Sequence, residues 1–431
     1  MEFRGIIFIS FLFLLLGVDS NAFPMNDLIT KLPGQPDVNF RQFAGYIDVD
    51  ENVVGRSLFY YFVEAEKDPM TQPLTIWLTG GPGCSSVGDG FGSVGPFIVT
   101  KDAHALQTNF FSWNKVSNLL FIDSPIGSGW SYSNISIDYN NGDDSTNNIL
   151  LTFMQKWYEK YPVFKSKDLY LAGLSFAGHF VPNLANALLD DNKQSKQSKF
   201  NLKGLVVPKV STEVDMCIPL RVQFYFNLPE VQKAFHGNRT NLSYQWKGCF
   251  TASFKYNEAD KDLDMLPALQ NLLQQSIPIT IFRLVYICMP IFLQYFPEIT
   301  GDQDGIIPTM GTLQHLEKLA DELNIKLTKR KHGALVTRYI YASNYPSNMI
   351  TQFGSKLQQE ILSVDSIGLI SVFKASSHYL PSSIGLEGGL KYEFGDLLKF
   401  LTVKGSNHHV TSSRPSQAFS IYKIFAINWM H

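Results

Sequence analysis

Short apolar runs alternate along this chain with longer stretches in which apolar residues recur every three or four positions. The runs predict buried strands over residues 74–78, 118–125, 168–172, 201–207, 277–282 and 397–403. The longer stretches predict helices that begin near Ser145, Phe176, Met265, Met310 and Ser416. Alternating strands and helices are typical of an α/β protein with a mainly parallel sheet and helices on both faces.

Ligands of such sheets bind beyond the carboxyl ends of the strands, so the residues that follow each strand are the candidates for chemistry. Ser175 follows the strand 168–172 in the stretch Gly173-Leu174-Ser175-Phe176-Ala177. A sharp turn with small flanking residues exposes a serine oxygen at the edge of the sheet. The pattern is weak by itself, because Ala177 stands where a second glycine is usual and glycine-rich connections are common.

Two later strands are followed by residue types that would complete the chemistry. Asp304 comes after the strand 277–282, and His408 comes after the strand 397–403. A histidine can take the serine proton, and an aspartate can orient the histidine. Taken singly, His408 could be an ordinary loop histidine and Asp304 a turn residue. The order Ser, Asp, His is that of an α/β-hydrolase.

An acyl-transfer site also needs backbone N–H groups that bind the oxyanion of the tetrahedral intermediate. Gly81 lies in the glycine loop "TGGPGCSS" after the strand 74–78, and Phe176 follows the serine at the start of a helix. A glycine loop allows close approach, and the first turn of a helix presents N–H groups. These two residues are therefore the candidates for the oxyanion hole.

Composition and charge narrow the classes of function. The chain has 431 residues, of which 45% are hydrophobic, enough to bury a large core in one big domain or two smaller ones. Its formal net charge is -2, without a basic run, which argues against nucleic acid or an anionic membrane as the main partner. No Cys-x-x-Cys pair or His cluster offers a metal site, and no cofactor is expected.

The first residues predict entry into the secretory pathway. Residues 1–22 combine one arginine, an apolar core from Ile7 to Val18 and small residues at a cleavage position, as in a signal peptide. A signal anchor is the alternative, but the apolar core is short for a bilayer, and no other segment is expected to span one. Secretion permits disulfides, and the four cysteines allow three full pairings. Candidate glycosylation sites are Asn134, Asn238 and Asn241.

Several longer motifs together resemble the serine carboxypeptidase family, and more closely its plant serine carboxypeptidase-like members. They include "GGPGCSS", "GLSFAGHFVP", "FYFNLPEVQKAF", "GDQDGIIP" and "TVKGSNHHV", and the resemblance covers most of residues 40–206, 215–282, 301–330 and 388–428. It implies an α/β-hydrolase fold in one domain over residues 23–431 and an extracellular or vacuolar location. It also implies a nucleophile, acid and base at Ser175, Asp304 and His408, an oxyanion hole at Gly81 and Phe176, and a disulfide between Cys84 and Cys249.

The chain departs from this family where a peptide's terminal carboxylate would be recognised. Substrate-binding positions fall on Thr79, Gly80, Ser93 and Leu174. The family has an asparagine and two glutamic acids where Thr79, Ser93 and Leu174 stand here. The hydroxyls of Thr79 and Ser93 are expected to remain as donors, but each lost charge-assisted hydrogen bond could cost about 1.5–3 kcal/mol.

The chain also departs from the family by one missing region and two additional blocks of sequence. After Val207 the family's cap region is largely missing, and additional sequence stands near 283–300 and 332–387. These blocks could be untrimmed splicing product or real elaborations. We favour the first interpretation, because the earlier block divides a strand from its catalytic loop.

Three functions are compatible with these residues. The first is a secreted serine carboxypeptidase that releases C-terminal residues from peptides through an acyl-enzyme. The second is an acyltransferase that passes the acyl group to an alcohol, and the third is a catalytically impaired family member. Peptides or small esters are the expected substrates, and the sequence does not specify an oligomeric state.

Overall fold

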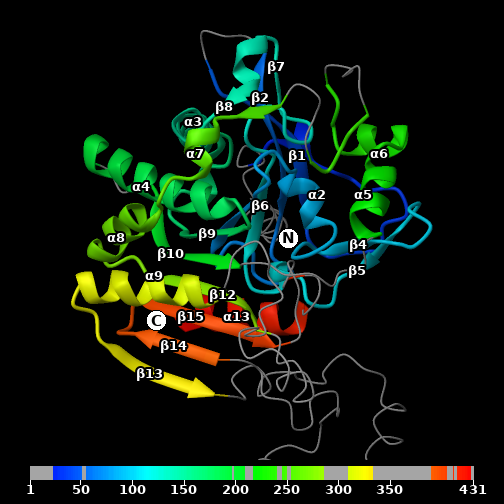
Figure 1. The fold of residues 1–431 in the computed structure, drawn as a ribbon. Coiled ribbons are helices and arrows are strands. Elements are labelled where there is room, and N and C mark those ends of the chain that lie inside the picture. Colours follow the sequence, from blue (N-terminus) through cyan, green and yellow to red (C-terminus); the bar gives the residue numbers. More distant parts are fainter. Residues whose placement is uncertain are drawn as a thin grey trace, which may run out of the picture.

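The computed structural model describes residues 23–50, 55–196, 199–208, 217–239, 245–249, 254–285, 309–332, 390–404, 411 and 415–428 (Figure 1). The strands are β1 Gln42–Asp48, β2 Arg56–Val63, β3 Leu74–Thr79, β4 Phe97–Val99, β5 Leu106–Thr108, β6 Asn118–Ile122, β7 Tyr132–Ser133, β8 Asn140–Asn141, β9 Asp168–Leu174, β10 Asn201–Pro208, β11 Lys255–Tyr256, β12 Ile279–Val285, β13 Leu327–His332, β14 Leu390–Phe394 and β15 Leu398–Lys404. The α-helices are α2 Ser86–Gly90, α3 Asp143–Lys160, α4 Ala177–Ser195, α5 Ile218–Phe226, α6 Pro229–Ala234, α7 Glu258–Lys261, α8 Leu266–Gln274, α9 Thr309–Glu322 and α13 Pro415–Asn428.

The architecture is a mixed sheet with helices on both faces, as the alternation of strands and helices predicts. Ten strands follow the order β1-β2-β6-β3-β9-β10-β12-β15-β14-β13, and β7 pairs with β2. The six predicted strands, β6, β3, β9, β10, β12 and β15, form the centre and are parallel to one another. The antiparallel edges, β1 with β2 and β13 with β14, were not predicted.

The central strands read as continuous apolar runs because both faces of the sheet are covered. In β9, Leu169 and Leu171 belong to the core on one face, whereas Tyr170, Ala172 and Leu174 belong to the core on the other. Alternate side chains of a strand point to opposite faces, so a strand between two helical layers must be apolar at every position. The first core takes its α-helical residues from α3, α4, α8 and α9, and the second from α2, α5, α6 and α13.

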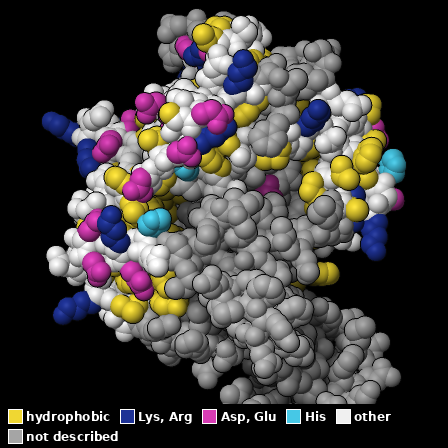
Figure 2. Space-filling model, viewed as in Figure 1, with side chains coloured by type: hydrophobic (Ala, Val, Ile, Leu, Met, Phe, Trp, Pro, Cys, Tyr) yellow, Lys and Arg dark blue, Asp and Glu magenta, His cyan; other side chains and the backbone are white. Residues whose placement is uncertain are grey.

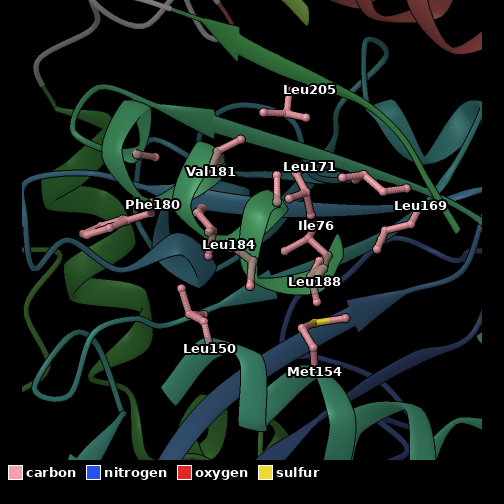
Figure 3. Packing of buried hydrophobic residues seen from close by; sticks show 14 of the residues in the cluster. Ile76, Leu150, Met154, Leu169, Leu171, Phe180, Val181, Leu184, Leu188 and Leu205 are labelled. Carbon is pink, nitrogen blue, oxygen red and sulfur yellow. The ribbon is translucent and has the colours of Figure 1, made fainter. Parts of the chain in front are cut away.

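Helix α4 fixes the turn that carries Ser175, because its apolar side packs firmly on the sheet. Phe180, Val181, Leu184 and Leu188 are buried, as their helical spacing predicts, and belong to one cluster with strand residues such as Ile76 and Leu171 (Figure 3). Burial of each such side chain contributes about 1.5–3 kcal/mol. The first turn of α4 is therefore held rigidly against β9.

One helix begins earlier than predicted. The sequence predicts a start near Ser145, where a serine can act as a helix cap, but α3 starts at Asp143, and the Ser145 hydroxyl accepts a hydrogen bond from the Gly142 N–H at 3.0 Å. Ser145 is thus the third residue of the helix, whose hydroxyl binds the N–H group of the N-cap residue Gly142, rather than the cap itself. The shift brings the Asp143 carboxylate to the first turn of an 18-residue helix, where the helix dipole favours a negative charge.

The block of additional sequence near 332–387 begins at a paired position of the sheet. His332 of β13 lies opposite Leu390 of β14 in antiparallel register. The residues between them, the block near 283–300 and the predicted signal peptide lie outside the described residues, except Arg283, Leu284 and Val285, which end β12. Within the described ranges, no helix is long and apolar enough to cross a bilayer.

Described charges are distributed in small groups of both signs on the surface. On the face shown in Figure 2, Lys and Arg side chains are interspersed with Asp and Glu, and hydrophobic side chains gather over α5 and α6. Leu220 and Phe224, one turn apart on α5, are 56% and 68% exposed. A cavity of about 590 Å³ lies beside them and is also lined by Lys101, Asp102 and His104.

Candidate active site

Ser175 occupies a strained turn between β9 and α4. Its φ is 61°, a left-handed conformation that non-glycine residues seldom adopt and that costs on the order of 1–3 kcal/mol. A Cβ on Gly173 would lie 2.7 Å from the Ala177 Cβ, so these two small residues allow strand and helix to meet closely. Gly178 has no neighbour within 4 Å of such a Cβ, and its small size is not needed for packing. The half-buried serine therefore stands at the carboxyl end of β9.

The glycine loop after β3 lies against this turn. A Cβ added to Gly80 would be only 2.2 Å from the Phe176 backbone nitrogen, so no larger residue fits there. Gly81 follows with φ 115° and is exposed, and the Cys84 N–H donates to the Gly80 carbonyl at 3.0 Å. The structure thus brings together three sequence-predicted site residues, Gly80, Gly81 and Phe176, beside Ser175.

A disulfide joins this loop to a distant part of the chain. Cys84 and Cys249 are bonded, with Cα atoms 3.9 Å apart and a sequence separation of 165. The two residues also form an antiparallel bridge, and the neighbouring Ser85 N–H donates to the Gly248 carbonyl at 2.7 Å. The expected pairing is confirmed, and it fixes the C-terminal end of the glycine loop.

Two of the predicted substrate-binding positions, Thr79 and Ser93, form hydrogen bonds to Asp89 of α2. The Thr79 hydroxyl donates to Asp89 Oδ2 at 3.0 Å and accepts a hydrogen bond from Trp77 Nε1 at 3.1 Å. The Ser93 hydroxyl donates to the Asp89 carbonyl at 2.9 Å. Each hydroxyl has a single proton and donates it to Asp89 in this structure, so the expected donation by Thr79 and Ser93 to a substrate stays a prediction.

A second carboxyl group, Asp123, lies beneath the loop at the end of β6. It is fully buried and accepts hydrogen bonds from the Ser85 hydroxyl at 2.6 Å and from the Val87 and Trp130 N–H groups at 3.1 Å. Burial raises the pKa of Asp123 to about 7, although these hydrogen bonds act in the opposite direction. Asp123 therefore connects β6 to the start of α2 and to the loop that carries Gly81.

An aromatic cluster flanks Phe176 on its other side. The Phe176 ring stacks on His179 at 4.3 Å and meets Tyr256 edge-on at 5.4 Å. The Asp143 carboxylate holds both partners: Tyr256 donates to it at 2.5 Å, and His179 Nδ1 lies 3.2 Å from it. Burial alone would raise the pKa of Asp143, but the hydrogen bonds from His179 and Tyr256 lower it overall. The cluster restrains the ring of the residue that follows Ser175.

Asp304 and His408 lie outside the described residues, so the expected convergence of these residues with Ser175 stays a prediction. The strands before them end at the same edge of the sheet as β9. Strand β12 ends at Val285, which pairs in parallel with Lys404 at the end of β15. Carboxyl ends of parallel strands meet at one edge, which is where an α/β protein binds its ligands.

The three candidate glycosylation sites differ in their surroundings. Asn134 is exposed after β7. Asn238 is half-buried, and its side-chain amide donates to Gln232 Oε1 at 3.2 Å. Asn241 lies outside the described residues. In the described part of the chain, no group of three His, Cys, Asp or Glu side chains is arranged to hold a metal ion.

Sequence reasoning missed Asp89, Asp123 and the cluster around Asp143. Asp123 could have been found, because it is an acidic residue directly after an apolar run whose end belongs to the binding edge. Asp89 gave no such signal, since its contacts to Thr79 and Trp77 depend on how the glycine loop turns back over β3. The same is true of Tyr256, which is 113 residues from Asp143 in the sequence.

Comparisons with known proteins agree with this geometry. The family model described as serine carboxypeptidase matches residues 33–216 and 207–428. The chain is 35% identical to serine carboxypeptidase-like 44 of Arabidopsis thaliana, covering 95% of this chain and 91% of that protein. It is 34% identical to serine carboxypeptidase-like 41 of the same plant, covering 95% and 93%.

A solved structure shows the same fold. The crystal structure of a prohormone-processing carboxypeptidase from Saccharomyces cerevisiae superposes with a TM-score of 0.66 at 18% identity, covering 94% of this chain and 96% of that one. Sheet order, the Ser175 turn and the matched family model all point to one group of proteins. The chain belongs to the serine carboxypeptidase family, which has the α/β-hydrolase fold.

Proposed function

We propose that this protein is a serine-type carboxypeptidase of the secretory pathway, extracellular or vacuolar, that releases C-terminal residues from peptides. The observation that carries the proposal is the left-handed turn of Ser175 at the end of β9, beneath the Gly80–Gly81 loop. Such a turn presents the serine oxygen to a substrate and places two backbone N–H groups beside it. The membership of the family supports the reaction class.

The proposed reaction has two steps. The Ser175 Oγ attacks the scissile carbonyl carbon while His408 takes its proton, and Asp304 stabilises the charged imidazole. The Gly81 and Phe176 N–H groups bind the oxyanion. The C–N bond then breaks, the amine leaves with the proton from His408, and water hydrolyses the resulting ester by the same route.

The test uses the full secreted chain and a fluorophosphonate probe, which phosphonylates an activated serine. The wild type is expected to become labelled and Ser175→Ala is not. Blocked dipeptides then show whether the labelled enzyme releases the C-terminal residue. A wild-type chain that takes up no label would mean that the protein is a catalytically impaired member of the family.

A second function, acyl transfer to an alcohol, is favoured by one observation. Thr79 and Ser93 give their hydroxyl protons to Asp89, so they offer none to a peptide's terminal carboxylate. An acyltransferase forms the same ester on Ser175 but passes it to an alcohol rather than to water. Sugar-ester donors with alcohol acceptors distinguish the two, because only the transferase yields a new ester.

A further inference from the structure

The aromatic cluster beside the nucleophile also reaches the glycine loop. The Phe254 ring lies over the α-carbon of Gly83, because a Cβ added to this glycine would be 2.7 Å from the ring. Phe254 stacks on Tyr256 with ring centroids 6.5 Å apart, and Tyr256 meets the Phe176 ring edge-on at 5.4 Å. Phe254 and Tyr256 thus form an aromatic bridge between the two sides of the proposed oxyanion hole.

The carboxylate of Asp143 holds the aromatic bridge at its Tyr256 end. The Tyr256 hydroxyl donates to Asp143 Oδ1 at 2.5 Å, and the Asn183 side-chain amide donates to Oδ2 at 3.3 Å. Burial acts to raise the pKa of Asp143, but the hydrogen bonds from His179 and Tyr256 lower it overall, so the group is ionised and only accepts. The His179 Nδ1–H group, 3.2 Å from Oδ2, is therefore a third donor.

These contacts join parts of the chain that are far apart in the sequence. Asp143 begins α3, His179 lies in the first turn of α4, and Tyr256 ends β11. Asp143 and Tyr256 are 6% and 7% exposed, so water scarcely replaces a hydrogen bond that is lost between them. Without the Tyr256 hydroxyl, the carboxylate turns toward its other donors and the Tyr256 ring is free to shift against its aromatic neighbours.

We propose that Asp143 and Tyr256 are positioning residues of the oxyanion hole, because their hydrogen bond fixes the aromatic bridge and the bridge sets the separation of the Gly81 and Phe176 N–H groups. They act through the glycine loop and the Phe176 ring, not on the substrate. A misplacement of about 1 Å can lower a rate on the order of a hundredfold, whereas a neutral ground-state carbonyl gains little from these donors. The inference rests on the proposed function, because it concerns the oxyanion hole of the same acyl-transfer site.

The test is Tyr256→Phe, which removes one hydroxyl and keeps both rings of the aromatic bridge. With a blocked dipeptide as substrate, kcat is expected to fall by about tenfold to a hundredfold, while KM stays within about twofold of the wild-type value. A peptide boronic acid, which adds to a serine and places a negatively charged oxygen in the oxyanion hole, should lose affinity by the same factor as kcat/KM. An unchanged kcat, or a boronic acid that binds as tightly as to the wild type, would overturn the proposal.

Tyr158→Phe is the matched control. It removes a buried hydroxyl that has no hydrogen-bond partner among the described residues, fifteen residues and therefore about 22 Å along α3 from Asp143. Its kcat, KM and affinity for the boronic acid are expected to equal those of the wild type, and a comparable fall in kcat would overturn the assignment to Tyr256. If Tyr256→Phe does not fold, His179→Phe, checked for the same thermal midpoint as the wild type, removes a donor to Asp143, keeps a ring against Phe176 and should lower kcat in the same way.

Amide hydrogen exchange separates this inference from a failure of the proposed function. If the wild type neither turns over the dipeptide nor takes up a serine-directed label, the hydrolase proposal fails, but exchange in segments 80–86 and 176–183 can still be followed by mass spectrometry. Both segments are expected to exchange faster in Tyr256→Phe than in the wild type and Tyr158→Phe, because a loosened aromatic bridge lets both sides of the hole open more often. Equal exchange, or a change confined to one segment, would overturn the inference.

Discussion

Replacement of Asp123 by asparagine should reveal a buried carboxyl group that destabilises the fold as it ionises. Asp123 is fully buried at the end of β6 and accepts hydrogen bonds from Ser85, Val87 and Trp130. Asparagine has nearly the same shape and no charge. The substitution lowers the free energy of unfolding by an amount that does not depend on pH, because the asparagine N–H group lies against other hydrogen-bond donors. It also raises the free energy of unfolding at higher pH relative to the wild type, because asparagine cannot ionise.

The gain follows from the two pKa values. Burial raises the pKa of Asp123 from 3.8 to about 7, and three pH units at 1.36 kcal/mol each make about 4 kcal/mol. Asp123 holds its proton more tightly in the native state than in the unfolded chain. Its contribution to the free energy of unfolding is therefore fully present below the unfolded pKa of 3.8 and is lost as the pH rises through about 7. Between pH 5 and pH 8 the linkage relation gives a loss of about 2.5 kcal/mol in the wild type.

Urea unfolding followed by tryptophan fluorescence at pH 5, 6, 7 and 8 measures this loss. The difference in free energy of unfolding between Asp123→Asn and the wild type should shift in favour of the variant by about 2.5 kcal/mol across that range. The fixed cost of the amide cancels in this comparison. A difference that stays constant from pH 5 to pH 8 would show that Asp123 titrates as an ordinary carboxyl group and would refute the reasoning.

Asp138→Asn provides the control with the opposite sign. Burial raises the pKa of Asp138, but hydrogen bonds from Arg56 at 2.7 Å and from Ser133 at 2.5 Å lower it overall. The stability from Asp138 is therefore present above its unfolded pKa and is lost only in acid. Its substitution should cost the same free energy at every pH from 5 to 8.

Three further changes test the disulfide, the glycosylation sites and the additional sequence. Cys249→Ser opens a loop of 165 residues, and chain entropy predicts a loss of about 5 kcal/mol in the free energy of unfolding; a loss below about 1 kcal/mol would show that the link to Cys84 adds little. Asn134→Gln should remove one glycan from the secreted protein on a denaturing gel, whereas Asn238→Gln should not, because Asn238 is half-buried and already donates a hydrogen bond. Replacing residues 333–389 by Asn-Gly should leave the thermal midpoint unchanged, since the flanking strands are in register for a two-residue hairpin; a lower midpoint would mean that the block contributes to the fold.

The centre of the fold could be predicted from the sequence because each strand there is apolar on both faces and short. The edge strands could not be predicted, because their own sequences lack a clear strand pattern and they form strands only by pairing with a neighbour. Strand β1 includes Gly45 and a polar end, and its burial depends on β2 lying beside it. Strand β13 contains three basic residues, as an edge strand can, since charge at an edge discourages further pairing.

The same distinction holds for the site. Ser175 could be predicted because its turn is encoded locally, by Gly173 and Ala177 on either side. Asp123 and Asp143 act on partners that are far away in the sequence: Ser85 is 38 residues from Asp123, and Tyr256 is 113 residues from Asp143. No spacing rule links such residues before the order of the strands is known.

The contact between Thr79 and Asp89 changes what a return to the family's residue would achieve. An asparagine at position 79 would normally donate its amide protons to a terminal carboxylate, but here Asp89 Oδ2 accepts the hydrogen bond from residue 79 at 3.0 Å. The ratio of kcat/KM for a blocked dipeptide acid to kcat/KM for its carboxamide measures how well a terminal carboxylate is recognised. Thr79→Asn alone should leave this acid-to-amide ratio unchanged, because the new amide donates to Asp89. Combined with Asp89→Asn, it should raise the ratio above that of Asp89→Asn alone, because an amide proton then remains for the substrate. An increase from Thr79→Asn by itself would show that Asp89 does not capture the donor at this position, and the two residues would have to be treated as independent.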